Sequence, residues 1–507
     1  MKFVSLHTHT TFSYADGFGT VEEHVDRIAN LGMRALGISE HGNVNSHVAL
    51  ERHAKRVGIK PIFGIEAYFG PTGDKATRQK THLGIYAMNK EGYHNLNKIV
   101  TQSYIDSYQW PTVSPATLKE HNEGILVLSG CSDSLISCTL LGGKFLGERR
   151  EPSEGISDES IDKTGRRLQW FLDVFGPERF FLEVQRFPSL ERTCALNAEF
   201  AVLAKEYGIS LVATADVHYP RPTDNAMQAV IHAARWPSSK SDFQTETSWE
   251  YQANLSYPES DKEIIDDLVG TGLSRSEAEA AVAQTSVIAD QCTVELPKAK
   301  PLRFKTSAGR TAKEQLKAEV IKGWEKRIKQ RPSLSTKKKE YFTKAGQELK
   351  LINDKDFSDY FLATADLVNN AKHQNITVGP GRGSAAGSIV CYLLGITEID
   401  PLYPVFSRMI FERFIDPSRT DMPDIDIDFD DELRYKIPER ARQIYGKENV
   451  ANVANHISYR GKKALQDVAR AYGLPAKTFD PIGKRCSLRV ETDDRVDDSI
   501  KDVLVSY

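Results

Sequence analysis

The sequence predicts an α/β fold over roughly its first 220 residues, followed by a mainly helical second half. Short apolar runs that read as strands alternate there with amphipathic helical patterns such as the one over 21–31. The clearest of these apolar runs are 35–39, 60–66, 124–130 and 210–216. Strand–helix alternation of this kind predicts a largely parallel sheet, either open or closed into a barrel.

Length and composition limit what the chain can be. It has 507 residues, so about two to four domains are expected. Hydrophobic residues make up 40% and charged residues 27%, with a net charge of −3, which is a globular composition. The near-neutral charge argues only weakly against nucleic-acid binding, because acidic metal sites can offset local basic patches.

The cysteines and the first residues bear on the compartment. Six cysteines occur singly and none forms a CxxC pair, which argues against zinc fingers and against a disulfide framework. The N-terminal run Met-Lys-Phe-Val-Ser-Leu-His reads as a strand and not as a signal peptide. No apolar run is long enough to span a bilayer. We therefore expect a cytoplasmic protein with no membrane partner.

The second half begins with a connector at 296–306, which contains two prolines. From 311 to 350 the chain is helical and rich in lysine, which indicates either a solvated helix face or a surface that faces DNA. Further helices are expected over 360–372 and 433–445, and basic helical sequence follows from about 451.

Side chains of the kinds that bind metals gather near the ends of the predicted strands. His7 and His9 are two residues apart on the first strand, so they share one face and can hold one metal ion. The other members of this set are Asp16, His41, Glu66, His82, Cys131, Asp216 and His218. A lone histidine pair is more often structural, but a full set at successive strand ends predicts a metal cluster. Its ligand types suit zinc, manganese or iron.

A second candidate site lies in the C-terminal half. The turn at 379–384, Gly-Pro-Gly-Arg-Gly-Ser, has three glycines in five residues and leads into an apolar helix pattern. Such a backbone can come close to a bulky anion. Further along, Asp424, Asp426 and Asp428 alternate with isoleucine, so in a strand they share one face. Carboxylates held this close need divalent cations between them. Together the two motifs indicate two-metal phosphoryl or nucleotidyl transfer, and an exposed edge strand is the alternative.

The N-terminal set resembles that of the polymerase and histidinol phosphatase (PHP) family, metal-dependent phosphoesterases on a distorted α/β barrel. The resemblance matches the family's nine ligand positions to His7, His9, Asp16, His41, Glu66, His82, Cys131, Asp216 and His218. It implies a trinuclear Zn²⁺ or Mn²⁺ site that hydrolyses phosphate esters, for example as a 3′–5′ exonuclease. A metal site that only stabilises the fold is the alternative.

The C-terminal motifs, together with the segments Ile-Thr-Glu-Ile-Asp-Pro at 396–401 and Phe-Glu-Arg-Phe-Ile-Asp-Pro at 411–417, resemble the bacterial replicative C-family polymerases, the DNA polymerase III alpha subunits. That resemblance implies a PHP domain over 1–275, the first part of an α+β palm over 276–450 and the start of a helical thumb over 451–507. It implies that Asp424 and Asp426 hold two Mg²⁺ ions, with Asp428 in support on the same face. The residues that it places at the triphosphate of the incoming nucleotide are Gly381, Arg382, Gly383 and Ser384, with Arg413 nearby. Lys462 would contact DNA.

The family's palm also needs a third aspartate, on a strand after the thumb, and this sequence does not contain that strand or the fingers. We therefore expect either one part of a split polymerase, completed by a second polymerase chain or by protein splicing, or a truncated gene. In each case we expect little or no synthesis by this chain alone. Primer–template DNA and deoxynucleotides would be the substrates, and a sliding clamp or a proofreading subunit would be further partners. Two other interpretations remain open, namely a stand-alone PHP phosphoesterase or exonuclease, and a non-enzymatic scaffold of the replication machinery.

Overall fold

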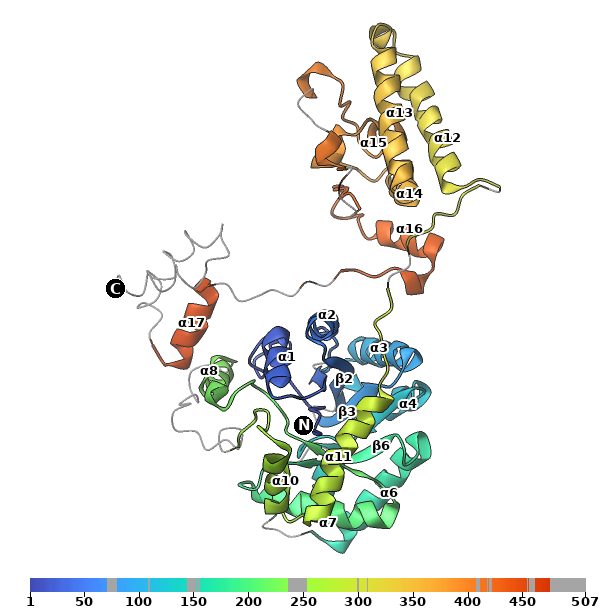
Figure 1. Ribbon diagram of the computed structural model, residues 1–507. Helices are drawn as coiled ribbons and strands as arrows, with labels where there is room; N and C mark the ends of the chain where they lie inside the picture. Colours follow the sequence, from blue (N-terminus) through green and yellow to red (C-terminus); the bar gives the residue numbers. More distant parts are fainter. Residues whose placement is uncertain are drawn as a thin grey trace. The chain divides into compact units, whose positions relative to one another are not determined.

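The computed structural model describes residues 1–70, 80–107, 110–143, 152, 156–235, 253–298, 301–307, 309–406, 411–416, 418, 422–453, 455 and 461–474. The chain forms two compact units, Met1–Pro297 with Ser458–Tyr507, and Lys298–Ile457 (Figure 1). The first unit extends past residue 275 because helix α11 (Arg275–Gln291) packs against the last strand of its sheet.

A seven-stranded sheet forms the centre of the first unit. The strands are β1 (Ala35–His41), β2 (Lys60–Phe69), β3 (Thr81–Ala87), β4 (Thr112–Val113), β5 (Ile125–Leu128), β6 (Phe180–Gln185) and β7 (Leu211–Thr214). They are ordered β1-β2-β3-β5-β6-β7, with β4 paired to β2. All pairings are parallel except those that β3 makes with β2 and β5. The four strands that the apolar runs predicted are therefore confirmed as β1, β2, β5 and β7, and β3, β4 and β6 lie outside those runs.

The N-terminal segment closes this sheet into a distorted barrel. Ser5 bridges Leu36 of β1, and Thr8 bridges Val217 just after β7, both in parallel orientation. The His9 N–H donates to the Val217 carbonyl at 2.7 Å, and the Val217 N–H donates to the His7 carbonyl at 3.0 Å. A side chain on Gly37 would place its Cβ only 2.9 Å from the Leu6 Cα, so a glycine there permits the close approach. Strand–helix alternation left an open sheet and a barrel as alternatives, and these bridges close the sheet into a barrel.

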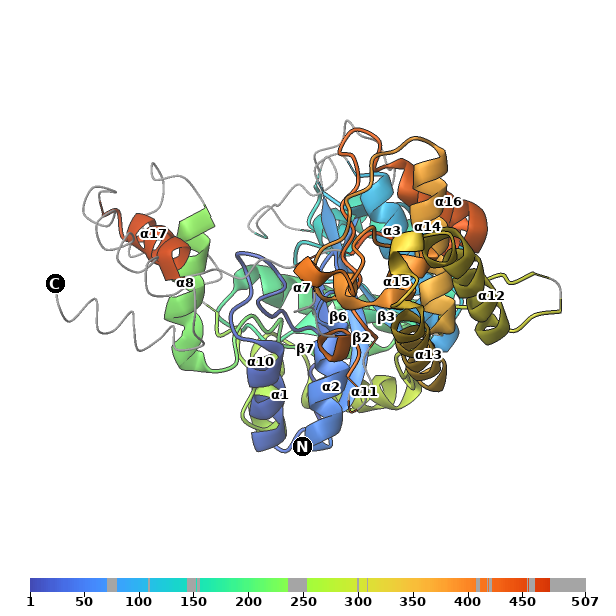
Figure 2. The same ribbon diagram turned by 90° about the horizontal axis from the view of Figure 1, so that it is seen from above.

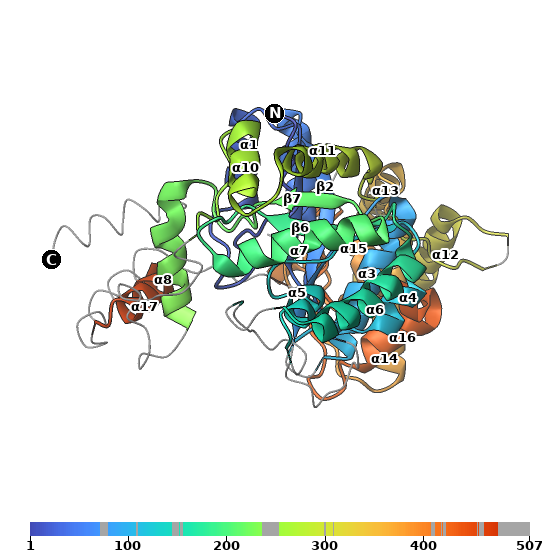
Figure 3. The ribbon, with the colours of Figure 1, turned by 90° about the horizontal axis from the view of Figure 1, so that it is seen from below.

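Helices cover the outside of the barrel, as Figure 3 shows. They are α1 (Val21–Asn30), α2 (His47–Val57), α3 (Lys90–Ile105), α4 (Pro115–Glu120), α5 (Leu135–Leu140), α6 (Asp158–Phe175), α7 (Glu191–Tyr207), α10 (Asp261–Gly270) and α11, whereas α8 (Asn225–Arg235) stands beside the barrel. Helix α1 shows why they begin where they do, because Thr20 and Glu23 form a reciprocal capping box at its start. A further helix, α17 (Gly461–Ala471), packs on α8, and the two lie side by side in Figures 2 and 3.

The second unit is helical. Its helices are α12 (Ala312–Trp324), α13 (Lys338–Asp354), α14 (Ser358–His373), α15 (Ile389–Leu394) and α16 (Lys436–Tyr445). The short α15 is fully buried and packs against α12, α13 and α14. Within the described part of 298–457 there is no strand, only an isolated antiparallel bridge between Val378 and Phe429. The strand expected for the aspartate row is therefore reduced to this one bridge.

Among all the helices that the structure describes, none combines the length and the apolar character needed to cross a membrane.

Candidate metal centre

Strand register brings three of the predicted ligands to one end of the barrel. His41 is the last residue of β1 and lies in register with Glu66 of the parallel strand β2. His82 is near the start of β3, and because β3 runs antiparallel, its start lies at the end where β1 and β2 finish. Barrel enzymes place their chemistry at this end of the strands.

The remaining ligands reach the same place from loops and from the N-terminal segment. His7 and His9 flank the bridge between Thr8 and Val217, which sets them beside Asp216 and His218. Asp216 has a φ of +44°, a left-handed conformation that is strained for a non-glycine residue and is often seen at functional sites.

Glu66 lies between four imidazole rings. Its Oε1 is 3.2 Å from His7 Nε2 and 3.1 Å from His82 Nδ1. Its Oε2 is 2.9 Å from His41 Nδ1 and 3.6 Å from His9 Nε2. Burial alone would raise the pKa of Glu66, but the surrounding histidines hold that pKa well below its ordinary value. The carboxylate therefore stays charged at the centre of the cluster.

Asp16 forms a second focus. Its Oδ2 lies 2.5 Å from His41 Nε2 and 3.3 Å from His218 Nε2. Burial works against charge on His41, but Glu66 and Asp16 raise its pKa to about 10. Burial also works against charge on His218, but Asp16 and Asp216 raise the pKa of His218 to about 9. The cluster thus concentrates negative charge that favours cations.

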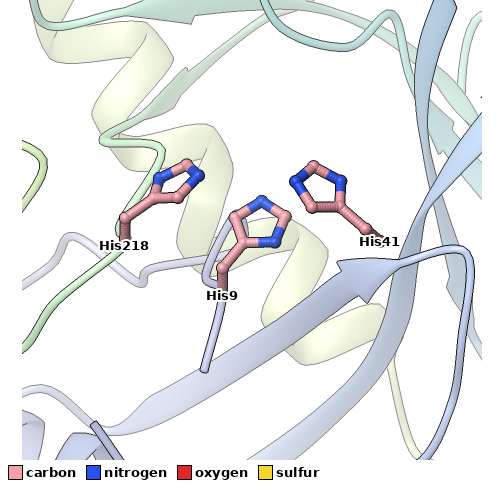
Figure 4. Close-up of side chains that lie close together, drawn as sticks. All are labelled: His9, His41 and His218. Atoms are coloured by element: carbon pink, nitrogen blue, oxygen red, sulfur yellow. The ribbon is translucent and has the colours of Figure 1, made fainter. Parts of the chain in front are cut away.

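The rings of His9, His41 and His218 come from three different segments and gather around one space (Figure 4). His9 stacks on both partners, with ring centroids 4.3 Å and 4.5 Å apart. Burial is the largest cause that holds the pKa of His9 well below its ordinary value, and the nearby His41 and His218 add to it. His9 is therefore neutral, which is the form of histidine that binds metal ions.

Outer hydrogen bonds fix which nitrogen of His7 and of His9 faces the centre. The Ser13 hydroxyl donates its only hydrogen to Glu40 at 2.6 Å. Ser13 Oγ can therefore only accept from His9, and the His9 Nδ1–H donates to it at 2.9 Å. His7 Nδ1 lies 2.7 Å from Glu183 Oε1, which can only accept. Both Nε2 atoms therefore point inward, where they lie 3.1 Å apart. Two such lone pairs repel unless a proton or a metal ion lies between them.

The residues fit a metal cluster. Three groups have ligand atoms within 4.8 Å of one another, namely His9–His41–His218, His7–His9–Glu66 and His41–Glu66–His82. Buried Glu66 Oε1 and His41 Nδ1 have no hydrogen-bond partner of good geometry in the described part of the chain. The last two predicted ligands join the network, since Cys131 Sγ is 3.3 Å from His82 Nδ1 and Asp216 Oδ1 is 3.2 Å from His7 Nε2. Nitrogen, oxygen and thiol donors together suit a transition-metal ion.

Several supporting residues were not found from the sequence. Glu183 of β6 holds His7 and accepts from the Thr214 hydroxyl at 2.7 Å. Gln185 of the same strand donates to Asp216 Oδ2 at 3.0 Å. Two polar residues near the end of a buried apolar strand are a signal that could have identified both. His232, which lies 2.8 Å from Asp16, is on helix α8, where the sequence gives no such signal.

In the second unit, the glycine turn and the aspartate row lie side by side. The Gly379 N–H donates to the Asp428 carbonyl at 2.9 Å, and the Asp430 N–H donates to the Thr377 carbonyl at 3.0 Å. Gly383 has a φ of +63°, and a Cβ there would lie 2.8 Å from Asp426 Oδ2. Glycine adopts this left-handed φ at low cost, and a larger residue would also have to displace the end of the Asp426 side chain.

The turn directs its arginine toward the aspartates. Arg382 Nη1 donates to Asp428 Oδ1 at 3.2 Å, and Arg382 Nε lies 3.9 Å from Asp426 Oδ2. Ile425 and Ile427 pack against the helical core, so the alternation places the isoleucines inward as predicted. Asp424 and Asp428 are exposed and Asp426 is half-buried. Carboxylate oxygens suit Mg²⁺ chemically, although among the described residues this row does not form a compact ligand group.

The other predicted nucleotide and DNA contacts are placed as follows. Ser384 begins the short helix η5 (Ser384–Gly387), which contacts η7 (Phe411–Arg413), where Arg413 is exposed. Lys462 lies in α17, in the first unit, and its side chain is outside the described residues. In the lysine-rich region, Lys322 and Lys329 pair with Glu319 and Glu325 on the same helical stretch, as on a solvated face.

Comparisons with known proteins agree with both sites. The PHP domain family matches residues 5–187, and the bacterial DNA polymerase III alpha NTPase domain family matches residues 314–503. The DNA polymerase III subunit alpha of Aquifex aeolicus is 32% identical over 500 residues, which cover 95% of this chain and 41% of that protein. The Thermus aquaticus subunit is 30% identical over 548 residues, covering 96% of this chain and 42% of that protein.

An amidohydrolase from Chromobacterium violaceum is a structural neighbour at 16% identity. The match covers 43% of this chain and 88% of the neighbour's chain. Its TM-score of 0.25 is too low to establish a shared fold. The sequence relatives cover almost all of this chain in one alignment, and the two family matches fall on its two halves. This chain is therefore similar to bacterial DNA polymerase III alpha subunits along almost its whole length, and it spans about two fifths of the length of the relatives that it matches.

Proposed function

We propose that this chain carries the first part of the palm of a DNA-directed DNA polymerase, together with a metal-dependent phosphoesterase centre in its barrel. The observation that carries the polymerase assignment is the pairing of the glycine turn with the aspartate row, which sets Arg382 opposite Asp426 and Asp428. An anion-binding turn next to a carboxylate face suits nucleotidyl transfer to a primer.

In this proposal the palm residues act on the incoming deoxynucleotide. Bound Mg²⁺ ions, held by Asp424 and Asp426 with Asp428 in support, would activate the primer hydroxyl and balance the charge of the leaving pyrophosphate. Gly381 and Gly383 give the triphosphate access to the backbone. Around them, Ser384 and Arg413 supply polar contacts.

Arg382 has a separate part in the same proposal. Its planar guanidinium can donate two hydrogen bonds at once to phosphate oxygens. Its present partners are carboxylates on an open surface, so the same side chain can turn from Asp428 to a phosphate without crossing a buried layer. We assign the thumb contact with primer or template phosphate to Lys462.

We assign to the barrel centre the hydrolysis of phosphodiesters at a 3′ end, that is, a 3′–5′ exonuclease activity. Bound Zn²⁺ or Mn²⁺ would supply a nucleophile at neutral pH. Within the protein, Glu183 and Ser13 orient His7 and His9, and Glu66 keeps a negative charge among the histidines. Support comes from the gathering of all nine predicted ligands in one network.

The relatives are more than twice as long as the part that this chain matches, so the proposal assigns only the beginning of the palm to this chain. We assign the remaining palm carboxylate and the fingers to the part of the alpha subunit that lies beyond this match. Primer–template DNA is the substrate, a sliding clamp and a proofreading subunit are candidate further partners, and the cytoplasm is the site of action.

A labelled primer–template tests both activities at once, with Mg²⁺, Mn²⁺ or Zn²⁺ present. The wild-type chain is compared with Asp424→Ala/Asp426→Ala and with His7→Ala/His9→Ala. Primer shortening that is lost only in the histidine variant supports the exonuclease assignment. Extension that is lost only in the aspartate variant supports the palm assignment, and it would also show that no second chain is needed.

If neither reaction occurs with the chain alone, extension is measured after adding the remaining three fifths of a related alpha subunit. Complementation that depends on Asp424 and Asp426 supports the palm assignment. No extension under any condition, with partner capture unchanged in both variants, would favour the scaffold interpretation.

A further inference from the structure

Asp16 differs from the other predicted metal ligands in how it is held. Most of the others lie on or directly beside strands and bridges of the barrel, whereas Asp16 lies on the loop between the N-terminal segment and α1. The preceding residue, Ala15, has a φ of +59°, and a Cβ on the following Gly17 would come within 2.3 Å of the Thr10 carbonyl oxygen. Within the loop, the Asp16 N–H donates to the Ser13 carbonyl at 3.1 Å, and further support for Asp16 comes from outside the loop.

That support comes from one face of helix α8. Gln228 and His232 are one turn apart, so they project from the same side of the helix. Gln228 Nε2 donates to the Asp16 carbonyl at 3.3 Å, and His232 Nε2 lies 2.8 Å from Asp16 Oδ1. A carboxylate oxygen only accepts, so the His232 N–H donates. The helix thus holds both the backbone and the side chain of Asp16.

The two carboxylate oxygens of Asp16 have separate tasks. Oδ2 faces His41 and His218 inside the cluster, and Oδ1 faces His232 outside it. Ligating carboxylates are commonly held in this way by an outer hydrogen bond, which fixes the direction of the ligating oxygen. Gln228 is fully buried, so its side chain cannot swing into solvent without opening the interface between α8 and the loop.

Helix α8 is anchored at its beginning and covered by α17. The Asn225 amide donates to the Tyr219 hydroxyl at 3.2 Å, next to the ligand His218. Helix α17 packs on α8 (Figure 2). Arg470 of α17 donates to the Ala234 carbonyl at 3.4 Å, and Ala234 lies two residues beyond His232 on α8. The support of Asp16 therefore continues, through α8, to a helix from the far end of the sequence.

We propose that Gln228 and His232 are positioning residues of the barrel metal centre, and that α8 links the occupancy of this centre to the docking of α17. A metal ion that binds Asp16 Oδ2 stabilises the geometry in which His232 holds Oδ1, and so it stabilises α8 under α17. By reciprocity, loosening α8 weakens metal binding. This inference rests on the metal-centre part of the proposed function.

Metal binding to the full chain, first stripped with a chelator, provides the test. Zn²⁺ and Mn²⁺ are titrated against a competing chelating dye, and bound metal is counted by mass spectrometry. We expect His232→Ala to weaken the affected site about 10- to 100-fold. His232→Gln retains an N–H donor and should recover most of that affinity. The matched control is His94→Ala, at an exposed position on α3 outside the cluster.

Amide hydrogen exchange gives a second readout that does not depend on activity. Metal should slow exchange in 225–235 and in 461–471 of the wild-type chain, and His232→Ala should remove the slowing in both segments. If His232→Ala binds metal as His94→Ala does, and exchange in α8 and α17 does not respond to metal, the inference is wrong while the metal centre stands. If the wild-type chain binds no metal, the metal centre itself is wrong, and this inference fails with it.

Circular dichroism of the metal-free variants shows whether His232→Ala folds. If it does not, Gln228→Glu provides the second variant, because it places a charge against the Asp16 carbonyl without removing volume. The same loss of affinity is expected there, and unchanged affinity would overturn the proposal.

Discussion

The Glu348 carboxylate of α13 accepts a hydrogen bond of 2.8 Å from the Ser388 hydroxyl, at the point where the glycine-turn segment enters α15. The same Oε2 accepts from the Val390 N–H at 3.1 Å, and Ser388 Oγ in turn accepts from the Cys391 N–H. Only 2% of Glu348 is exposed. One buried acidic side chain therefore holds the exit of the proposed nucleotide-binding turn.

This relationship predicts a pH dependence of the second unit. Burial raises the pKa of Glu348 from 4.5 to about 7, and the hydrogen bonds only partly oppose it. The folded state therefore holds a proton that the unfolded chain releases, and this contribution to stability is lost as pH rises from about 4.5 through 7. At ~1.4 kcal/mol per pKa unit, the loss is about 3 kcal/mol.

Glu348→Gln tests this pH dependence, because glutamine keeps an acceptor for Ser388 and does not titrate. Amide exchange in α13 and α15, measured at several pH values, should show a smaller decline in local stability for the variant than for the wild type. Equal declines would mean that Glu348 does not carry the effect.

Removing metal should destabilise the barrel and leave the helical unit unchanged. Without a cation, the inward nitrogens of His7 and His9 depend on a shared proton. A ligand at about 100 times its dissociation constant stabilises the folded state by ~2.7 kcal/mol. We expect a chelator to lower the thermal midpoint of the wild-type barrel and to have no effect on His7→Ala/His9→Ala. Exchange in α12–α15 serves as the internal control.

Gly383→Ala should disturb the turn through its backbone and through its contact with Asp426. The left-handed φ costs an alanine about 1 kcal/mol or more, and its Cβ would press on Asp426 Oδ2. We expect weaker deoxynucleotide binding and lower stability of the second unit. Gly346→Ala is the matched control, because that site is in α13 and a Cβ there meets nothing within 4 Å. It should stabilise the helix by about 0.5–1 kcal/mol. Similar behaviour of the two variants would contradict the argument.

Arg382→Gln should weaken deoxynucleoside triphosphate binding about tenfold or more, because a charge-assisted pair contributes roughly 1.5–3 kcal/mol. Arg382→Lys should recover only part of the affinity, since an ammonium lacks the planar fork. Fluorescent-nucleotide titration at two salt concentrations measures both. Arg434→Gln changes an exposed arginine that pairs with Asp431, and it should have no effect. Equal affinity of the Arg382 and Arg434 variants would remove Arg382 from the site.

Much of the barrel and its centre could be predicted from the sequence, because both depend on local patterns. Apolar runs identified four strands, and ligand types placed near their ends identified the cluster. The antiparallel direction of β3 was not predicted, although β3 follows its partner β2 after the short connection 70–80, and a short connection suits antiparallel pairing. The support from His232 was missed because only the packing of α8 brings it to Asp16.

The aspartate row was predicted correctly in one respect and wrongly in another. The alternation gave the right faces, with Ile425 and Ile427 against the core. A strand also needs a neighbour that supplies hydrogen bonds along its length, and the described part of this unit offers only the bridge between Val378 and Phe429. Side-chain periodicity reports which face is buried and does not report whether a ladder forms.

The closure of the barrel by the N-terminal segment has a consequence for synthesis on the ribosome. The segment around Ser5 can pair early with β1, but the partner of Thr8 on the other edge, Val217, is made much later. Contacts between such distant segments form slowly. His7 and His9 therefore meet Asp216 and His218 only after β7 has been made and has joined the sheet. We expect a nascent chain to capture metal as a late event, so that metal uptake marks a completed barrel.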